Sequence, residues 1–298
     1  MRQTETYPRL VISLSEEELF VILKLLQAPM IAGMDLSRRQ NSSDEPGSEN
    51  VTDVLSIVLK GLVARGSLVP LQENGELPLS LAPSQELRGK PWKRISLSQI
   101  VRLLVSASAF ATRSLLLSWH TINGEDLLYV HERDGLFVVT TSPLPGVYTF
   151  TALDGWEAVW QLITSKLALQ EQTLPKPSLP SITLPRETVK HLQEHAAQPE
   201  EEQRELYTCL TQAGLPSSAA QTMLETLQQV QIAANIQMCT SEQEANSQAN
   251  GKQPYRIGLL LTTHTLFVAE PQQGANEMLL IRQATAQEIE AIVHAFWL

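Results

Sequence analysis

The sequence predicts an α+β protein built from two pseudo-symmetric modules that share one antiparallel β-sheet. Three observations support this prediction. Each half of the chain runs from helical patterns through a series of short strand patterns to one closing helix. Short glycine-containing turns separate the strand patterns, and such turns join antiparallel neighbours. A proline-rich stretch near the middle separates the two halves.

We expect an N-terminal α+β module at residues 1–169, with a start like that of a winged helix, followed by a β-meander and a closing helix. A proline-rich linker is expected at residues 170–183 and a C-terminal pseudo-repeat at residues 184–298. The 298 residues are enough for two ordinary domains, and 43% hydrophobic residues can form a substantial core.

Two helices open the first module. Ser15 and Glu18 have the spacing of a capping box, which predicts a helix over residues 16–27. A second helix is expected over residues 51–64. It ends before Gly66, because glycine readily adopts the left-handed conformation found at helix ends.

A hairpin is expected next, with strands at residues 67–71 and 77–81. Asn74 and Gly75 lie between them, and an Asn-Gly pair favours a tight turn. The preceding helix, its glycine stop and this hairpin together resemble half of a winged helix.

A third helix is predicted over residues 96–110, because Ser96 and Gln99 again have capping-box spacing. Its apolar residues recur at helical spacing, so we expect one side to be buried. The residues expected in the core are Ile100, Leu103 and Leu104.

A meander of four strands follows this helix. The predicted strands are residues 114–120, 126–132, 136–141 and 147–151. The turns between them are marked by Asn123-Gly124, Asp134-Gly135 and Pro145-Gly146. A closing helix is expected after Asp154, which has Glu157 three residues later. Its apolar face is formed by Trp156, Val159, Trp160, Ile163 and Leu167.

The second module repeats this plan. Helices are predicted from Leu184-Pro185 to His195, over residues 200–213 before Gly214, and from a capping box at Ser218 and Gln221. The last of these should bury Met223, Leu224 and Leu227. Strands are predicted at residues 232–239, 255–261, 265–269 and 278–281. Thr285 and Glu288 then cap a final helix with Ile289, Ile292, Val293 and Phe296 on one face.

Paired landmarks argue for an internal duplication. The Ser96 box matches the Ser218 box, the Asp154 cap matches the Thr285 cap, and the strand at 136–138 matches the strand at 266–268. Capping boxes and apolar strands also recur by chance in α+β proteins. The order and spacing together favour duplication.

Composition restricts the partners and the compartment. The net charge is −10, and most of this negative net charge belongs to the second half. This argues against a general nucleic-acid groove, since phosphate binding needs clustered Lys and Arg. Cys209 and Cys239 lack metal-ligand spacing and suit a reducing compartment. With no signal peptide or membrane span expected, we predict a cytoplasmic protein without membrane insertion.

Residues His191, Glu194 and His195 fit H-x-x-E-H, a pattern found in zinc hydrolases, because two histidines four residues apart share a helix face. The alternative is a solvated helix face that carries two histidines by chance. We favour the second interpretation because the segment is short and polar.

A basic cluster lies just after the predicted hairpin. It could grip DNA beside a wing, but the predicted recognition helix carries only Lys60 before Arg65. We therefore favour a solvated connection whose aromatic residue packs on the core. The cluster consists of Arg88, Lys90, Trp92, Lys93 and Arg94.

The remaining candidates are four histidines and the C-terminal aromatic residues. No nucleophile elbow and no glycine-rich phosphate loop accompanies the histidines, so we expect core or surface roles for His120, His131, His264 and His294. The apolar end at Phe296, Trp297 and Leu298 either closes the core or forms a docking patch, and burial is slightly favoured. No catalytic, cofactor-binding or metal-binding residue is assigned, and we expect no enzyme activity and no cofactor.

One further pattern is the order and spacing of six segments over most of the chain: Gly61–Val69, Gly75–Leu79, Leu127–Val130, Leu136–Val139, Gly146–Phe150 and the helix from Trp156. In this pattern the chain resembles the EspG family, cytosolic chaperones of type VII secretion. This resemblance implies a central antiparallel sheet with helical bundles and approximate two-fold symmetry.

The resemblance also implies a non-catalytic adaptor that covers an aggregation-prone helical tip of a secreted partner until export. The residues that would contact the partner, and the oligomeric state, are not fixed by any motif. The alternative function is a winged-helix DNA-binding regulator with a ligand-sensing second half.

Overall fold

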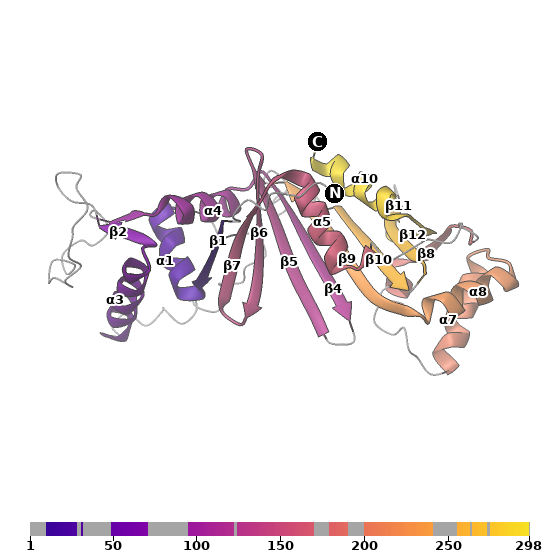
Figure 1. Cartoon of the computed structure of the whole chain (residues 1–298). Coiled ribbons are helices and arrows are strands. Elements are labelled where there is room, and N and C mark those ends of the chain that lie inside the picture. The colour runs from indigo at the N-terminus through magenta and orange to yellow at the C-terminus, as the bar shows by residue number, and fades with distance from the viewer. Residues whose placement is uncertain are drawn as a thin grey trace. The chain divides into compact units, whose positions relative to one another are not determined.

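The structure is a computed structural model. It describes residues 10–28, 31, 49–70, 95–121, 124–169, 179–189, 200–240, 255–262, 264–272 and 275–297. Ten strands belong to one large antiparallel sheet with the order β1-β7-β6-β5-β4-β9-β10-β11-β12-β8. The predicted α+β class with a central antiparallel sheet is therefore confirmed (Figure 1).

The strands of this sheet lie in two runs along the chain. In the first half they are β1 (Val11–Ser15), β4 (Arg113–Thr121), β5 (Gly124–Arg133), β6 (Leu136–Leu144) and β7 (Val147–Leu153). In the second half they are β8 (Ile182–Pro185), β9 (Val230–Thr240), β10 (Tyr255–Thr262), β11 (Leu266–Gln272) and β12 (Ala275–Gln283).

The strand order reads alike from both ends. From one end it runs β1-β7-β6-β5-β4, and from the other β8-β12-β11-β10-β9. In each run the outermost strand comes first in sequence and pairs with the last strand of the following meander. The strand pairing is therefore alike in the two runs, and the internal duplication stays a prediction.

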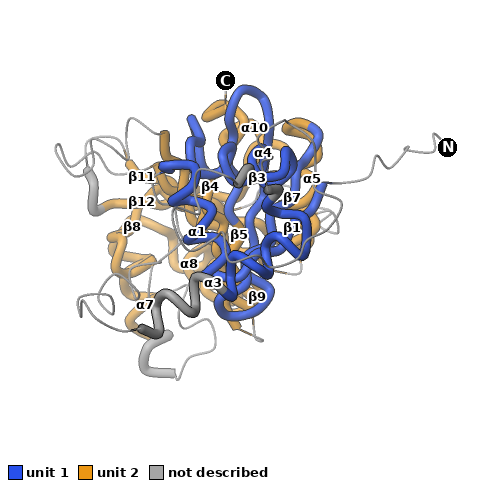
Figure 2. The backbone as a smooth tube through the Cα atoms, turned by 90° about the vertical axis from the view of Figure 1, so that its left-hand side faces the viewer, with its two compact units in different colours: residues 1–114, 129–154 blue, residues 115–128, 155–298 orange. Residues whose placement is uncertain are grey.

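The chain divides into two compact units, coloured separately in Figure 2. Unit 1 contains residues 1–114 and 129–154, and unit 2 contains residues 115–128 and 155–298. This division is based on compactness, whereas the predicted boundaries at 169 and 184 concern repeated modules. Those boundaries stay a prediction.

The described part of unit 1 contains the helices α1 (Glu16–Leu26), α3 (Glu49–Ala64) and α4 (Gln99–Ala109), and a small second sheet of β2 (Leu68–Pro70) and β3 (Ile95–Leu97). Helix α4 packs on β6 and β7, and α1 contacts both α3 and α4. The buried core between these elements includes Leu19, Ile22, Leu62, Leu104 and Phe150.

Helix α1 confirms the expectation from its capping box. The Ser15 hydroxyl accepts a hydrogen bond from the Glu18 N–H, and the Glu18 carboxylate accepts one from the Ser15 N–H at 2.9 Å. These bonds satisfy two N–H groups that lack a partner within the helix. Helix α3 is followed by Gly66 with φ of +70°, so the predicted glycine stop is also confirmed.

The expected hairpin is only partly testable. Strand β2 confirms the prediction for residues 67–71, but residues 77–81 and the Asn74-Gly75 turn lie outside the described residues. The strand that pairs with β2 is β3, with Leu68 opposite Leu97. This long-range pairing was not expected from the sequence.

The predicted capping box at Ser96 and Gln99 is wrong. Ser96 lies in β3, and the helix is capped by Ser98, whose hydroxyl accepts a hydrogen bond from the Val101 N–H at 3.4 Å. The Ser98 N–H in turn donates to the Ser67 carbonyl at 2.9 Å. The strand pairing continues to Leu97 and moves the start of the helix two residues along the chain.

We expect Ser98→Ala to destabilise unit 1 by about 1 kcal/mol, because it removes the cap of α4. Ser96→Ala is the matched control and should change the free energy of unfolding by less than about 0.5 kcal/mol. Urea unfolding of both variants checks this. A larger loss for Ser96→Ala than for Ser98→Ala would contradict the observed cap.

Burial on α4 also differs from the prediction. Leu104 is fully buried, as expected, but Ile100 and Leu103 are 43% and 46% exposed. The core side of α4 is formed instead by Val101, Leu104, Val105 and Ala109, with small residues between them. Residues 100, 103 and 104 and residues 101, 104 and 105 both recur at helical spacing, so the sequence pattern fits two adjacent faces of α4. The face with Val101 and Val105 is buried against the core, which leaves Ile100 and Leu103 outside.

The meander strands β4 to β7 confirm the predicted strands at 114–151. Asp134 and Gly135 both have positive φ, and Gly146 has φ of +74°, as tight turns require. Asn123 lies outside the described residues. The closing helix α5 (Gly155–Lys166) follows, with Val159, Trp160 and Ile163 buried.

Unit 2 contains α5, α7 (Glu200–Gln212), α8 (Ser217–Leu227) and α10 (Ala286–Trp297). Helix α7 packs on α8 and β8, and α8 packs on β10. Gly214, with φ of +98°, follows α7 as predicted. The expected burial of Met223, Leu224 and Leu227 is confirmed.

One predicted helix in this unit starts two residues later than predicted, and one predicted capping box is wrong. Leu184 and Pro185 end strand β8, and the chain becomes helical at Arg186; the rest of that predicted helix, from residue 190, lies outside the described residues. Helix α8 has Pro216 at its N-cap and no side-chain cap hydrogen bond, so Ser218 and Gln221 form no capping box. The last predicted box is confirmed at Thr285 and Glu288.

Candidate binding surfaces

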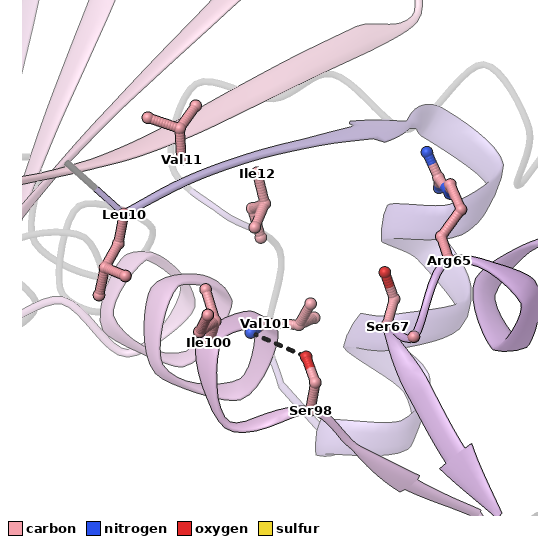
Figure 3. Close-up of a pocket in the computed structure, with 9 residues that line it drawn as sticks. Leu10, Val11, Ile12, Arg65, Ser67, Ser98, Ile100 and Val101 are labelled. Atoms are coloured by element: carbon pink, nitrogen blue, oxygen red, sulfur yellow. Dashed lines mark hydrogen bonds between the residues drawn. The ribbon is translucent and has the colours of Figure 1, made fainter. Parts of the chain in front are cut away.

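Unit 1 contains a pocket of about 380 Å³ between β1, the turn after α3 and the start of α4 (Figure 3). Its lining residues are Leu10, Val11, Ile12, Arg65, Gly66, Ser67, Ser98, Ile100 and Val101. In the close-up, the Leu10 and Ile100 side chains lie near each other below β1, whereas Val11 projects from the other side of the strand.

The pocket lies beside several exposed apolar side chains. Leu10 is 39% exposed and Val11 52%, and both come from the start of β1. Leu103 lies one helical turn beyond Ile100 on α4 and is also exposed. Contiguous apolar groups on a surface are typical of sites that bind another molecule.

The polar groups at the pocket wall are largely used within unit 1. The Ser67 carbonyl and the Ser98 hydroxyl already accept the hydrogen bonds described above. Arg65 forms an ion pair with Glu18, and its side chain stays 49% exposed. The pocket therefore offers an apolar wall with one cationic side chain at its margin.

Unit 2 contains an aromatic cluster where α5 and α10 pack together. The Trp156 ring lies 6.4 Å from Trp160, 5.3 Å from His294 and 5.8 Å from Trp297, between ring centroids. Trp297 is 7% exposed, so the predicted burial of the C-terminal aromatic residues is confirmed there. Phe296 is only partly buried, and Leu298 lies outside the described residues.

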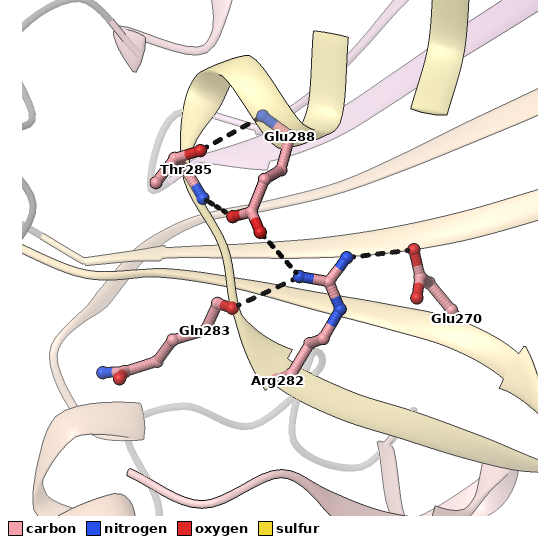
Figure 4. Close-up of polar contacts among 5 residues, drawn as sticks. All are labelled: Glu270, Arg282, Gln283, Thr285 and Glu288. Atoms are coloured by element: carbon pink, nitrogen blue, oxygen red, sulfur yellow. Dashed lines mark hydrogen bonds and ion pairs between the residues drawn. The ribbon is translucent and has the colours of Figure 1, made fainter. Parts of the chain in front are cut away.

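Polar contacts around Arg282 join β11, β12 and the start of α10 (Figure 4). The guanidinium lies 3.5 Å from a carboxylate oxygen of Glu270 and 3.5 Å from one of Glu288. It also donates to the Gln283 carbonyl at 3.5 Å. The other Glu288 oxygen accepts from the Thr285 N–H at 2.7 Å, so the same carboxylate caps α10. This arrangement fixes the closing helix and has no open coordination or nucleophilic group.

One buried histidine lies in unit 1. The His131 side chain is fully buried, its Nδ1 lies 3.2 Å from the Ser114 hydroxyl, and its ring stacks on Tyr129. Its Nε2 has no hydrogen-bond partner among the described residues. Burial lowers the pKa of His131 from 6.5 to about 4, so the ring is neutral at physiological pH.

Tyr255, at the start of β10, has a shifted pKa as well. Burial raises the pKa of Tyr255, and the Glu270 carboxylate adds to this effect, while the Arg282 guanidinium opposes it. The phenol therefore stays protonated at physiological pH.

The remaining sequence candidates do not assemble into a site. His120 lies 3.5 Å from Glu125, His264 is exposed, and the two cysteines form no disulfide. Among the described residues, no group of His, Cys, Asp and Glu could hold a metal ion. The H-x-x-E-H segment (His191, Glu194 and His195) and the basic cluster (Arg88, Lys90, Trp92, Lys93 and Arg94) lie outside the described residues. Sequence reasoning missed the pocket, because it placed Ile100 in the core and assigned no strand to residues 11–15.

Comparison with known proteins identifies the fold. No protein-family model and no curated protein matches the sequence. Among solved structures, the chain is similar to the Mycobacterium tuberculosis type VII secretion system chaperone EspG5, whose structure was determined in complex with the PE25–PPE41 dimer. The TM-score is 0.56 at 10% sequence identity, and the match covers 95% of this chain and 94% of that chain. The protein therefore shares an EspG-like fold, and within the described residues no helix is long and apolar enough to span a membrane.

Proposed function

We propose that the protein is a cytoplasmic, non-catalytic chaperone that binds a secreted helical protein and covers an aggregation-prone tip of it before export. The observation that carries this proposal is the EspG-like fold, which extends over nearly the full length of both chains. A chaperone of this kind contributes apolar contacts to a surface that would otherwise self-associate. The exposed apolar side chains of unit 1, among them Ile100 and Leu103, are consistent with such a role.

The acidity of the chain supports a protein partner. The net charge of −10 argues against a general nucleic-acid groove, because nucleic-acid binding depends on clustered cations. Binding to the folded client also stabilises both proteins by mass action. The partner should therefore raise the melting temperature of the chaperone, and the increase should grow with the logarithm of the partner concentration once that concentration exceeds the Kd.

Co-purification from the native host tests the proposal. The full-length chain, carrying a small affinity tag, should recover a secreted protein rich in helix in a fixed ratio at moderate salt. An unrelated tagged protein of similar net charge is the control. Recovery of nucleic acid that is lost as salt rises, or of no specific protein, would contradict the chaperone function.

A further inference from the structure

The hydrogen-bond pattern between β1 and β7 determines which backbone groups of β1 point away from β7. Within unit 1, β1 is the terminal strand and pairs with β7. The Ala152 N–H donates to the Leu10 carbonyl at 3.0 Å, and the Glu16 N–H donates to the Gly146 carbonyl at 2.8 Å. Both are directly opposed pairs of the β1–β7 register. In an antiparallel ladder such pairs alternate with pairs that make no hydrogen bond.

It follows that Ile12 and Leu14 direct their backbone groups toward β7, whereas Val11 and Ser13 direct theirs away from it. Ser15 also directs its backbone groups away from β7, and its N–H donates to the Glu18 carboxylate. Among the described residues, the outward N–H and C=O groups of Val11 and Ser13 have no hydrogen-bond partner. These four groups form an open edge beside the pocket of Figure 3.

We propose that this edge of β1 binds an extended segment of a partner protein as an added antiparallel or parallel strand. The outward groups of Val11 and Ser13 are two residues apart, about 6.6 Å along the strand, which is the spacing that a neighbouring strand matches. The interior of a helix has its backbone groups already bonded and cannot satisfy them. Main-chain hydrogen bonds would give the affinity, and the pocket would select the side chains.

The two sides of β1 define the sequence that fits. On the pocket side the added strand would meet Ile12, Ile100 and Val101, which favour apolar side chains. On the other side it would lie beside the exposed Val11 and Ser13, where polar side chains stay in water. Arg65 at the margin is paired with Glu18, but its side chain stays 49% exposed, so a carboxylate at one end of the segment can share its charge. The fitting segment therefore alternates apolar and polar residues and carries a carboxylate.

The structure distinguishes this edge from the opposite end of the strand order. The terminal strand β8 has only four residues and ends in Pro185, a residue that blocks strand addition. Strand β1 contains no proline, no charged residue and no register shift. A second copy of the chain is disfavoured as the occupant, because each copy carries a net charge of −10.

The test uses a dye-labelled synthetic peptide of alternating threonine and valine with an amino-terminal glutamate, titrated against the full-length protein by fluorescence anisotropy. The peptide should bind, and Val11→Pro should weaken binding by about tenfold or more, because proline removes an outward N–H and obstructs the neighbouring strand. Val11→Thr keeps the N–H and should stay within about twofold of the parent protein. A peptide of the same composition with its valines in one block is the negative control.

Val11→Pro should keep the thermal stability of the parent, because the Val11 N–H does not bond to β7. If that variant fails to fold, Ser13→Pro replaces it, since it removes the second outward N–H. No binding of the alternating peptide, or binding by a folded proline variant as tight as that of the parent protein, would overturn the proposal. So would a concentration-dependent dimer that Val11→Pro abolishes in sedimentation velocity, because the edge would then pair with a second copy. The assay needs no secretion client, so its outcome is independent of the chaperone function.

Discussion

Phe150→Ala should lower the free energy of unfolding by about 3–5 kcal/mol, because it leaves a large cavity in the core of unit 1. Phe150 is fully buried on β7, where it lies opposite Ile12 of β1 and Thr140 of β6. Its ring therefore stabilises strand β1 at the edge of the sheet as well as the helices that share this core. Natural domains are stable by only about 5–15 kcal/mol, so the loss is a large share of the total.

Urea unfolding followed by circular dichroism measures the effect. Leu144→Ala is the matched control, because Leu144 is an apolar residue on the neighbouring strand β6 but is 64% exposed. It should change the free energy of unfolding by less than about 0.5 kcal/mol. If Phe150→Ala were no more destabilising than Leu144→Ala, the core of unit 1 would not be packed as described.

His131 should make the protein less stable as the pH falls from 6.5 toward 4. The pKa of His131 is lowered to about 4 in the folded protein by burial, against 6.5 when exposed. Between these values the unfolded chain binds a proton that the folded chain does not, so the free energy of unfolding rises with pH. The full effect is about 3 kcal/mol, reached below pH 4 and absent above 6.5.

His131→Gln should remove this part of the pH dependence, because glutamine can still bond to the Ser114 hydroxyl but does not titrate. Carboxylates also titrate in this range, so the quantity to compare is the difference between parent and variant at each pH. His120→Gln, at a histidine whose side chain is 54% exposed, is the control for replacing an exposed histidine with glutamine. Parallel curves for the parent and His131→Gln between pH 4 and 6.5 would show that His131 is not buried in its neutral form.

Local sequence patterns predicted the elements that local chemistry determines. The Ser15 and Glu18 box, the Asp134-Gly135 turn and the Thr285 cap each depend on residues a few positions apart, and each is present. The meander strands were predictable because alternating apolar residues lie between glycine turns. The EspG resemblance could be stated from the order of these elements.

The errors have a common physical cause, which is pairing between distant segments. Strand β3 extends to Leu97 because it pairs with β2, and this places the cap of α4 at Ser98 in place of Ser96. Leu184 and Pro185 lie in a strand because β12 pairs with them. The free edge of β1 depends on its pairing with β7, and no local pattern contains that information.

The most direct test of the chaperone function is light scattering of the purified secreted partner with and without the full-length chain. The account predicts that the partner aggregates alone and stays soluble in an equimolar complex with this protein. Equal scattering in the presence and absence of the chain, under conditions in which both proteins are folded, would contradict it.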